Sequence, residues 1–590
     1  MAQESGLRSG DQRIITANTP TTGYQFAGWT GDTQYLSDPS QITTIVTMGN
    51  ANCTVTATDR LIPVMAPTKY VSSTGDNDNA GTVSSPWRTI EYAVANTTTP
   101  GDRIYLYNGT YNFSTKLVVP VGVSIEGQTR AGVILISSYP SSLTNTSDGS
   151  IALISGTVVN GNQSISRLTL TGNNITSKRG ITVAYRNNVF IHDCTITDFK
   201  LSGVLFKGSN NDWDIEPTPY CSGSGVYNCT ITNCSARITG AAQSASLYIN
   251  GQSGFVLHNC DFTQNTRQSA PAGEDNNGNI LGGEWFKGLQ IYDNSFIKRD
   301  VENTWNFFTE LWRWRGGGAI YNNIFVGAAA MDIVDVEKTT YAHGIDIHDN
   351  YFTTASGTSI AMPPNNIFAI NIELRSKIDD CYIYDNYFKN VPNGIDIDFH
   401  IYSGEGYTSV SCNNLNIYSN VFENVGMTDL QNFAISLDSD GPLTDITVTN
   451  TRIYNNTIKS IGGDQNVLAG IFMQVIGDWS DIYVQNNIVV GCASPVRIQP
   501  QGSTTPANIE TLVIQNNLYY ACDNDNVNFI AGITYTNAIV NTGQFVADPL
   551  LTSATDYHLL SGSPAIDAGV NVGLSYTGTA PDLGAFETSV

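Results

Sequence analysis

The segment IYDNYFKNV, residues 383–391, returns in nearly the same form along most of the chain. Aligned on the sixth letter of this phrase, the copies are IHDCTI (191–196), VYNCTI (226–231), LHNCDF (257–262), IYDNSF (291–296), IYNNIF (320–325), IHDNYF (347–352), IYDNYF (383–388), IYSNVF (417–422), IYNNTI (453–458), VQNNIV (484–489) and IQNNLY (514–519). Successive sixth letters are 27 to 36 residues apart, by subtraction. A repeat of this length in constant phase indicates a solenoid with one supersecondary unit per repeat.

The fourth letter of the phrase decides which kind of solenoid this is. It is Cys in the first three copies and Asn in all the later ones: Cys194, Cys229, Cys260, Asn294, Asn323, Asn350, Asn386, Asn420, Asn456, Asn487 and Asn517. Identical residues stacked about 4.8 Å apart form amide ladders at an inward turn. The short alternating strands between Gly, Asn, Asp and Ser turns exclude a helical solenoid. We therefore predict an all-β fold, a parallel β-helix of about 11–14 coils, in which the three cysteines are stacked buried thiols.

One segment departs from the strand pattern. SSPWRTIEYAVANT (84–97) places Trp87, Ile90, Ala93 and Val94 on one helical face and starts with Ser85-Pro86. The first coil of a β-helix exposes unpaired strand edges, so a cap is expected there. We predict a capping helix near residues 85–97.

The composition limits the partners. The chain of 590 residues has 52 acidic against 28 basic residues, a formal net charge of −24, and only 14% charged residues. Nucleic acid and anionic membranes are bound mainly through cationic patches, so neither is an expected partner. No apolar run approaches the roughly 18 residues that span a bilayer. The N-terminus MAQESGLRSGDQR has no apolar signal-peptide region, and we expect a monomer whose leader is not in this chain.

Three segments resemble known bacterial families. The stretch 70–111, YVSSTGDNDNAGTVSSPWRTIEYAVANTTTPGDRIYLYNGTY, resembles the opening of secreted bacterial right-handed β-helix proteins of the pectate-lyase-like superfamily. The tail, DPLLTSATDYHLLSGSPAIDAGV (548–570) with APDLGAFE (580–587), is similar to the closing segment called choice-of-anchor Q. Residues 14–59 resemble one internalin-type B-repeat, with Tyr24, Phe26 and Trp29 as its core aromatics. These resemblances imply a secreted or cell-surface bacterial protein.

The domain boundaries follow from these segments. We expect an N-terminal segment at 1–13, a partial B-repeat-like β module at 14–60 and a linker at 61–69. The right-handed parallel β-helix then covers 70–547, and a closing segment covers 548–590.

The candidate site lies in the strand that follows the phrase within each repeat. These strands are FFTELWRW (307–314), DIVDVEKT (332–339), INIELRSK (370–377), IDIDFHIY (395–402), ISLDSDGP (435–442) and IFMQVIGD (471–478). Alternate residues point outward, and we expect an outward column of Glu310, Asp335 or Glu337, Glu373, Asp398, Asp438 and Gln474. Stacked like charges repel one another, so such a column needs a cation or a function to compensate.

Three functions remain open for this column. In a glycoside hydrolase, two of Glu310, Glu373, Asp398, Asp335 and Glu337 act as acid and as base or nucleophile. Adjacent strands give a separation near 5 Å, suited to retention, and diagonal ones the roughly 6.5–9.5 Å suited to inversion. Sugar rings and their substituents would lie in a surface groove against substrate-binding residues, namely Trp305, Trp312, Trp314, Arg313, Arg315, Tyr402 and Lys377. Trp285 would extend that groove or pack beneath it.

In a polysaccharide lyase, carboxylates would hold Ca²⁺ against a uronate while Arg375, Lys338, Lys377 or His400 removes the proton α to the carboxyl group. The metal ligands would be Asp396, Asp398 and Asp438. In the third case the acids are solvated surface residues or structural Ca²⁺ ligands, and the β-helix is an adhesive or structural rod. The sequence requires no cofactor and allows Ca²⁺, and the expected partner is an extracellular polysaccharide. We favour hydrolysis.

Overall fold

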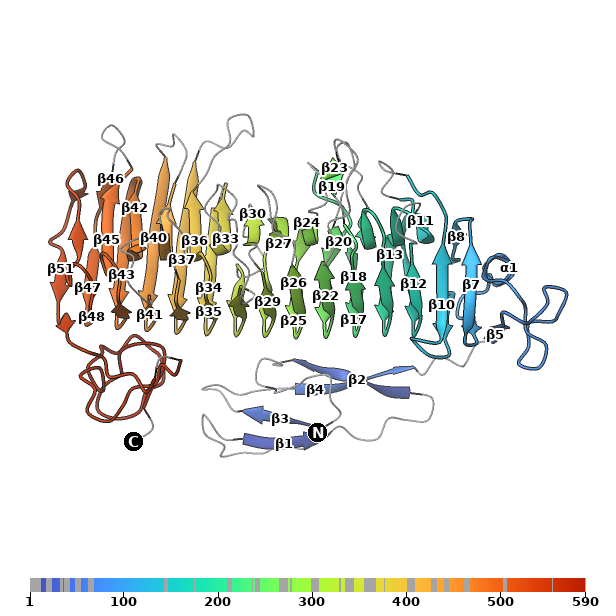
Figure 1. Ribbon diagram of the computed structural model, residues 1–590, viewed down its shortest axis with the longest axis horizontal. Helices are drawn as coiled ribbons and strands as arrows, with labels where there is room; N and C mark the ends of the chain where they lie inside the picture. The colour runs from blue at the N-terminus through green and yellow to red at the C-terminus, as the bar shows by residue number, and fades with distance from the viewer. Residues whose placement is uncertain are drawn as a thin grey trace.

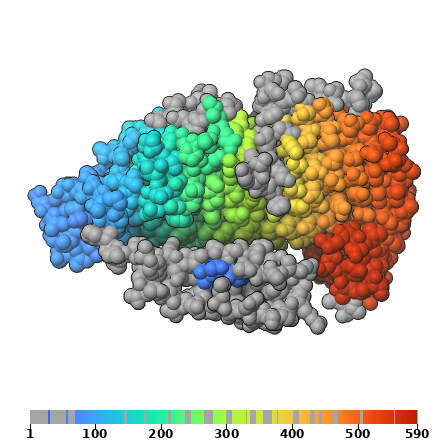
Figure 2. Space-filling model, turned by 180° about the vertical axis from the view of Figure 1, so that it is seen from behind, coloured from blue at the N-terminus to red at the C-terminus, as the bar shows by residue number. Residues whose placement is uncertain are grey.

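The computed structural model describes residues 12–16, 24–31, 36, 43–47, 55–61, 68–142, 147–172, 177–209, 215–235, 237–238, 245–264, 274–275, 279–298, 307–327, 330–334, 344–354, 368–375, 377–399, 409–425, 432–439, 445–460, 467–501, 507–553 and 555–588. Successive coils follow one another along the long axis, from α1 at one end to β51 at the other (Figure 1). The bands of successive colour in Figure 2 show the same order from behind.

Each coil contributes strands to three parallel sheets. The first sheet, which carries the candidate site, contains β8 (Leu117–Val118), the first halves of β11 (Ile151–Ser166) and β13 (Arg179–His192), β15 (Ser202–Lys207), β20 (Ala245–Ser253), β24 (Asn279–Lys287), β27 (Phe307–Trp314), β30 (Ala330–Val334), β33 (Phe368–Leu374), β36 (Asn393–Phe399), β39 (Asn432–Asp438), β42 (Val467–Val475), β45 (Val496–Pro500) and β49 (Asn528–Phe529).

The second sheet carries the start of each phrase. It contains β5 (Thr68–Val71), β6 (Arg103–Leu106), β9 (Ser124–Gly127), the second halves of β11 and β13, β17 (Gly225–Tyr227), β21 (Val256–His258), β25 (Leu289–Tyr292), β28 (Gly318–Tyr321), β31 (Asp346–His348), β34 (Lys377–Tyr384), β37 (Val410–Tyr418), β40 (Ile446–Tyr454), β43 (Gly477–Gln485), β47 (Leu512–Gln515) and β51 (Val540–Thr542). Short strands at the bend between these two sheets are β16 (Cys221–Ser222), β46 (Ala507–Ile509) and β50 (Thr534–Tyr535).

The third sheet carries the end of each phrase and has fifteen strands. They are β7 (Gly109–Phe113), β10 (Val133–Ser137), β12 (Thr169–Thr171), β14 (Thr195–Thr197), β18 (Thr230–Thr232), β22 (Asp261–Gln264), β26 (Ser295–Lys298), β29 (Ile324–Val326), β32 (Tyr351–Thr353), β35 (Tyr387–Lys389), β38 (Val421–Glu423), β41 (Thr457–Lys459), β44 (Ile488–Val490), β48 (Leu518–Tyr520) and β52 (Phe545–Val546). The predicted parallel β-helix is confirmed.

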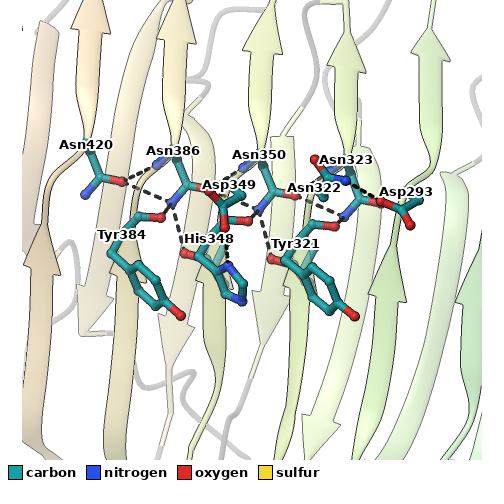
Figure 3. A network of polar contacts seen from close by, with 12 residues as sticks. Asp293, Tyr321, Asn322, Asn323, His348, Asp349, Asn350, Tyr384, Asn386 and Asn420 are labelled. Carbon is teal, nitrogen blue, oxygen red and sulfur yellow. Dashed lines mark hydrogen bonds and ion pairs between the residues drawn. The ribbon is translucent and has the colours of Figure 1, made fainter. Parts of the chain in front are cut away.

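The turn between the second and third sheets holds the asparagine ladder. Asn386 donates from Nδ2 to Asn420 Oδ1 at 3.0 Å and to the carbonyls of Ile347 and Tyr384 at 2.9 Å each. The same pattern runs from Asn294 to Asn517, and Figure 3 shows four of its members. The residue before each ladder position, such as Asp385 with φ 53°, is left-handed, a conformation that Asn and Asp tolerate well.

The ladder changes chemistry at both ends. Upstream, Cys194, Cys229 and Cys260 occupy the position as buried free thiols, as predicted. Downstream, Asn517 donates its backbone N–H to Gln544 Oε1, which the phrase alignment did not include.

The other letters of the phrase form two ring stacks. The sixth-letter rings from Phe262 to Phe422 stack inside the coil, with centroids 4.6–5.1 Å apart. The second-letter rings from His192 to Tyr454 stack outside it. Histidine and tyrosine alternate freely in this outer stack, so these histidines belong to the scaffold.

The helix α1 (Ile90–Asn96) is shorter than predicted. Thr89 caps it by accepting from the Tyr92 N–H at 3.3 Å, while Ser85 lies in the preceding turn. Ile90, Ala93, Val94 and Trp87 are buried, as predicted. The helix packs against β5, β7 and β8 at the N-terminal end of the solenoid, which is the expected capping position.

The C-terminal segment closes the side of the solenoid. The coils end at β52, close to the predicted boundary at 547. The segment that follows returns along the ladder turns (Figure 1), where Asn455 Nδ2 donates to the carbonyls of Asp582 and Gly584 at 3.1 Å each. Its Leu559, Ala565 and Leu583 pack with the outward side chains of β44 and β48.

The N-terminal module is a separate antiparallel unit. It pairs β1 (Gln12–Thr16) with β3 (Thr43–Thr47), and β2 (Tyr24–Gly31) with β4 (Val55–Leu61). Trp29 is half-buried, and the side chains of Tyr24 and Phe26 lie outside the described residues. One more antiparallel pair, β19 (Arg237–Ile238) with β23 (Glu274–Asp275), lies beside the β-helix strands. Among the described residues, no helix is long and apolar enough to cross a membrane.

The ladder predicts a position-dependent loss of stability. Asn386→Ala removes the two amide donations to carbonyls and leaves the Asn350 amide without its acceptor on the next rung. We expect the free energy of unfolding to fall by about 2–4 kcal/mol, measured by denaturant titration. Asn112→Ala, at an exposed position of β7, is the matched control and should change stability by less than about 0.5 kcal/mol. Equal effects of the two substitutions would contradict the importance of the ladder.

Candidate functional site

The outer face of the first sheet carries two neighbouring rows of residues, most of them polar. In register across the strands, the first row contains Gly282, Glu310, Asp332, Asn371, Asp396 and Ser436. The second row contains Glu284, Trp312, Val334, Glu373, Asp398 and Asp438. The residues between the rows, such as Ile333 and Ile372, point into the core and are 0% exposed. The rows therefore come from ordinary strand alternation.

The predicted column is correct in one half and wrong in the other. Glu373, Asp398 and Asp438 are strand neighbours in the second row, as predicted. Glu310 lies in the first row, where its neighbour is Asp332. The column was misaligned because the connections before these strands vary in length, which shifts the strand start relative to the phrase. The alternation in AMDIV, with Met331 and Ile333 inward, was the signal that marks Asp332 as outward.

Asp332 is a strongly perturbed carboxyl group on this face. It is 2% exposed, and its Oδ1 accepts from Asn371 Nδ2 at 2.8 Å. Burial, followed by the carboxylates of Glu373 and Glu310, raises the pKa of Asp332 well above its usual range. The Asn371 amide and the Arg375 guanidinium oppose this shift. Burial and the neighbouring acids thus favour the protonated form of Asp332.

Glu373 is fixed by Arg375. Nη2 of Arg375 donates to Oε2 of Glu373 at 2.8 Å, and the two side chains are 5% and 15% exposed. The guanidinium lies over the Trp312 ring, 4.5 Å from its centroid. Such a pair orients the carboxylate.

Glu284 anchors the upstream end of the rows and was not predicted. It is 4% exposed, and its Oε1 accepts from Asn250 Nδ2 at 2.9 Å and from the Tyr248 hydroxyl at 3.4 Å. Arg313 lies 3.6 Å from its Oε2. Burial and the carboxylates of Glu284 and Glu310 raise the pKa of Tyr248, so its hydroxyl remains a donor. We call Glu284, Glu310, Asp332 and Glu373 the acidic cluster.

Several predicted substrate-binding residues are packed against other side chains or lie on another sheet. Trp314 is fully buried, packs on Phe286 and donates from Nε1 to the Gly317 carbonyl, so it presents no face to a sugar. Arg315, 5% exposed, lies over the Trp285 ring at 4.8 Å, and Arg313 lies at 5.2 Å from the same ring. Trp285 is itself 6% exposed, which shows packing. Lys377 is on β34 of the second sheet, paired with Asp379 at 3.0 Å.

Of the remaining predicted site residues, some are described by the structure and others are not. Trp312 and Asp398 are half-buried in the second row, and Asp396 is 6% exposed in the first. With Glu284 and Asp332 also buried, this face carries no open row of solvated acids. Trp305, Asp335, Glu337, Lys338, His400 and Tyr402 lie outside the described residues.

The predicted metal ligands are not grouped as a metal site. Asp438 accepts from Ser436 Oγ at 3.1 Å within its own strand. Within the described ranges, no three His, Cys, Asp or Glu side chains are arranged to hold a metal ion. The calcium set of Asp396, Asp398 and Asp438 is therefore not supported by these residues.

Two family models match the chain. Residues 106–305 match the model described as "Right handed beta helix region", and residues 2–59 match "Divergent InlB B-repeat domain". The fold is a right-handed parallel β-helix. The resemblances stated from the sequence for the β-helix and the B-repeat are confirmed, and a search of curated proteins gives no match.

Three solved structures are similar to this chain at low sequence identity. Pectin methylesterase PemA from Erwinia chrysanthemi is 13% identical and covers 50% of this chain and 92% of its own, with a TM-score of 0.30. Alginate lyase from Paenibacillus sp. str. FPU-7 is 15% identical and covers 61% and 90%, with a TM-score of 0.28. PfbA, a surface adhesin of Streptococcus pneumoniae, is 13% identical and covers 76% and 88%, with a TM-score of 0.38. At these identities the similarity concerns the fold and does not extend to activity.

Replacing Asp332 and replacing Glu373 by their amides should have opposite effects on the free energy of unfolding. The folded state holds the Asp332 proton more tightly than the unfolded chain, whose pKa is near 3.8. Stability from this neutral acid is therefore complete below about pH 4 and is lost as pH rises through the raised pKa. Asp332→Asn should raise the free energy of unfolding at pH 7, because the neutral amide removes the cost of placing an ionisable carboxyl group in this buried position. Denaturant titrations of both proteins from pH 4 to pH 8 measure the gain in stability of the variant. They also show whether the variant has lost the pH dependence of stability that Asp332 gives the wild type.

Glu373→Gln is the matched comparison. It removes the carboxylate from the buried Arg375, so stability at pH 7 should fall by about 2 kcal/mol. An Asp332→Asn protein less stable than the wild type at pH 7 would mean that Asp332 is ionised and stabilising, against the assignment made here.

Proposed function

We propose that the protein is a glycoside hydrolase that cleaves an extracellular polysaccharide with Asp332 as general acid. The observation that carries the proposal is a buried carboxyl group with a raised pKa beside two further carboxylates on the same face. Pairs of acids whose pKa values are driven apart are the usual basis for assigning an acid and a base or nucleophile. A cluster that costs stability also fits a functional site better than a rod surface.

The roles follow from the positions in the rows. Asp332 would protonate the glycosidic oxygen, because burial and the neighbouring acids raise its pKa and so favour its protonated form. Glu310 is its direct strand neighbour, and adjacent strands are about 4.8 Å apart. This spacing suits the separation of about 5–5.5 Å in retaining enzymes, so Glu310 would be the nucleophile. Asn279 Nδ2 donates to Oε2 of Glu310 and would orient it.

Glu373 and Trp312 complete the proposed site. Glu373, held by Arg375, would keep a negative charge near the positive charge that develops on the sugar ring in the transition state. Trp312, half-buried in the second row between Glu284 and Val334, would pack against a sugar ring. The polysaccharide would be met outside the cell, in keeping with the secreted or surface location expected from the sequence.

The lyase alternative has less support from the described residues. Its proposed base Arg375 is engaged by Glu373, and a guanidinium does not deprotonate in proteins. Lys377 lies on another sheet. Lys338 and His400 remain candidates outside the described residues.

The test is cleavage of a broad polysaccharide panel, with two readouts taken together. A hydrolase produces reducing ends without the ultraviolet absorbance of unsaturated uronate ends, whereas a lyase produces both. Glu310→Gln and Asp332→Asn should each lower kcat by about 10³-fold. Asp478→Asn, an exposed carboxylate on β43 of the second sheet, is the control and should leave kcat unchanged.

The pH profile gives an independent check on the assignment of the acid. Activity should fall as pH rises through the raised pKa of Asp332, because the acid must hold its proton. Detection of unsaturated products would show that the enzyme is a lyase and would contradict the proposed hydrolysis. Binding of glycans without any product would favour the adhesive or structural rod.

A further inference from the structure

The orientation of the Asn250 side-chain amide, on β20, is set by its contact with Glu284. Its Nδ2 donates to Oε1 of Glu284 at 2.9 Å, which fixes the amide nitrogen toward the acidic cluster. Asn250 aligns with Glu284 across the strand pair β20–β24, so it extends the second row upstream by one strand. The Tyr248 hydroxyl reaches the same carboxylate oxygen at 3.4 Å. Asn250 therefore belongs to the edge of the cluster.

The other half of this amide has no donor. Asn250 is 3% exposed, and its buried Oδ1 has no hydrogen-bond partner. The opposite amide orientation would place the acceptor Oδ1 against the Glu284 carboxylate, so the hydrogen bond from Nδ2 to Glu284 favours the orientation described. Buried acceptors are nearly always satisfied, and one left open beside reactive groups indicates a place for a ligand donor.

The charge around this acceptor restricts what it binds. Glu284 is 4% exposed next to it, and Glu310 follows one strand further along in the first row. An anion such as a carboxylate, sulfate or phosphate group would meet both an acceptor oxygen and the field of these acids. A sugar hydroxyl is neutral and donates a hydrogen bond, so it suits an acceptor oxygen beside these acids.

We propose that Asn250 Oδ1 is a specificity determinant that accepts a hydrogen bond from a hydroxyl of an uncharged sugar unit bound upstream of the acidic cluster. This inference rests on the proposed function and specifies its substrate class: the unit at this position is neutral, whatever the charge of units further along. Sites that use a hydrogen bond to a substrate hydroxyl reject analogues lacking it, because the buried partner is then left unpaired.

The binding experiment uses the full chain carrying Asp332→Asn, so that bound glycans are not cleaved. It is applied to an array of neutral and uronate-containing oligosaccharides, and the strongest ligands are titrated calorimetrically. Adding Asn250→Ala should weaken binding of neutral oligosaccharides about tenfold, the usual effect of losing one buried hydrogen bond. Adding Asn112→Ala, far along the third sheet on β7, should leave the affinity unchanged. Preferential binding of oligosaccharides built only from uronates would overturn the proposal.

A kinetic experiment separates substrate contact from positioning of Glu284. On the polysaccharide that the wild type cleaves, Asn250→Ala should raise KM about tenfold and leave kcat within about twofold. A fall in kcat at constant KM would mean that Asn250 acts only through Glu284, and the proposal would fail. If the wild type cleaves the polysaccharide and the Asn250 variant has the same KM and the same affinity, this inference alone is overturned. Absence of both cleavage and binding across the panel would overturn the proposed function with it.

Discussion

The hydrogen bond between one ladder asparagine and the next sets the geometry on which the molecule depends. It links equivalent turns of successive coils at about the spacing of neighbouring strands. Every other column then repeats at that spacing, including the stacked rings inside and outside the coil and the rows on the first sheet. Side chains from residues tens of positions apart in sequence thereby become neighbours with a defined separation.

The same stacking brings the acids together at a cost. A row of carboxylates one strand apart raises the electrostatic energy of the folded state, and burial of Asp332 and Glu284 adds to it. Each is offset by a specific partner: Asn371 for Asp332, Arg375 for Glu373, and Asn250 with Tyr248 for Glu284. The outer ring stack of the second sheet needs no such compensation, which is why histidine and tyrosine interchange there.

How far the sequence predicts this structure depends on the constancy of spacing. The phrase has constant internal spacing, so the ladder, the thiol stack and both ring stacks follow from it. The strand after each phrase is reached through connections of varying length, so its phase is lost: Glu310 was placed in the wrong row and Asp332 was missed. Trp314 was misjudged because the chain bends at Arg313, with φ 58°, and turns the next side chain inward. No sequence pattern identifies Asn250 and Glu284, since they become neighbours only through the register between coils.

The protonation of Asp332 at neutral pH is the claim on which the chemistry depends. The most direct measurement is an infrared difference spectrum between the wild type and Asp332→Asn at pH 7, in the region of the protonated carboxyl C=O stretch. A neutral Asp332 predicts a protonated-carboxyl band in the wild type that is absent from the variant and disappears from the wild type at high pH. Spectra that differ only in the carboxylate bands would show that Asp332 is ionised and would contradict its role as the acid.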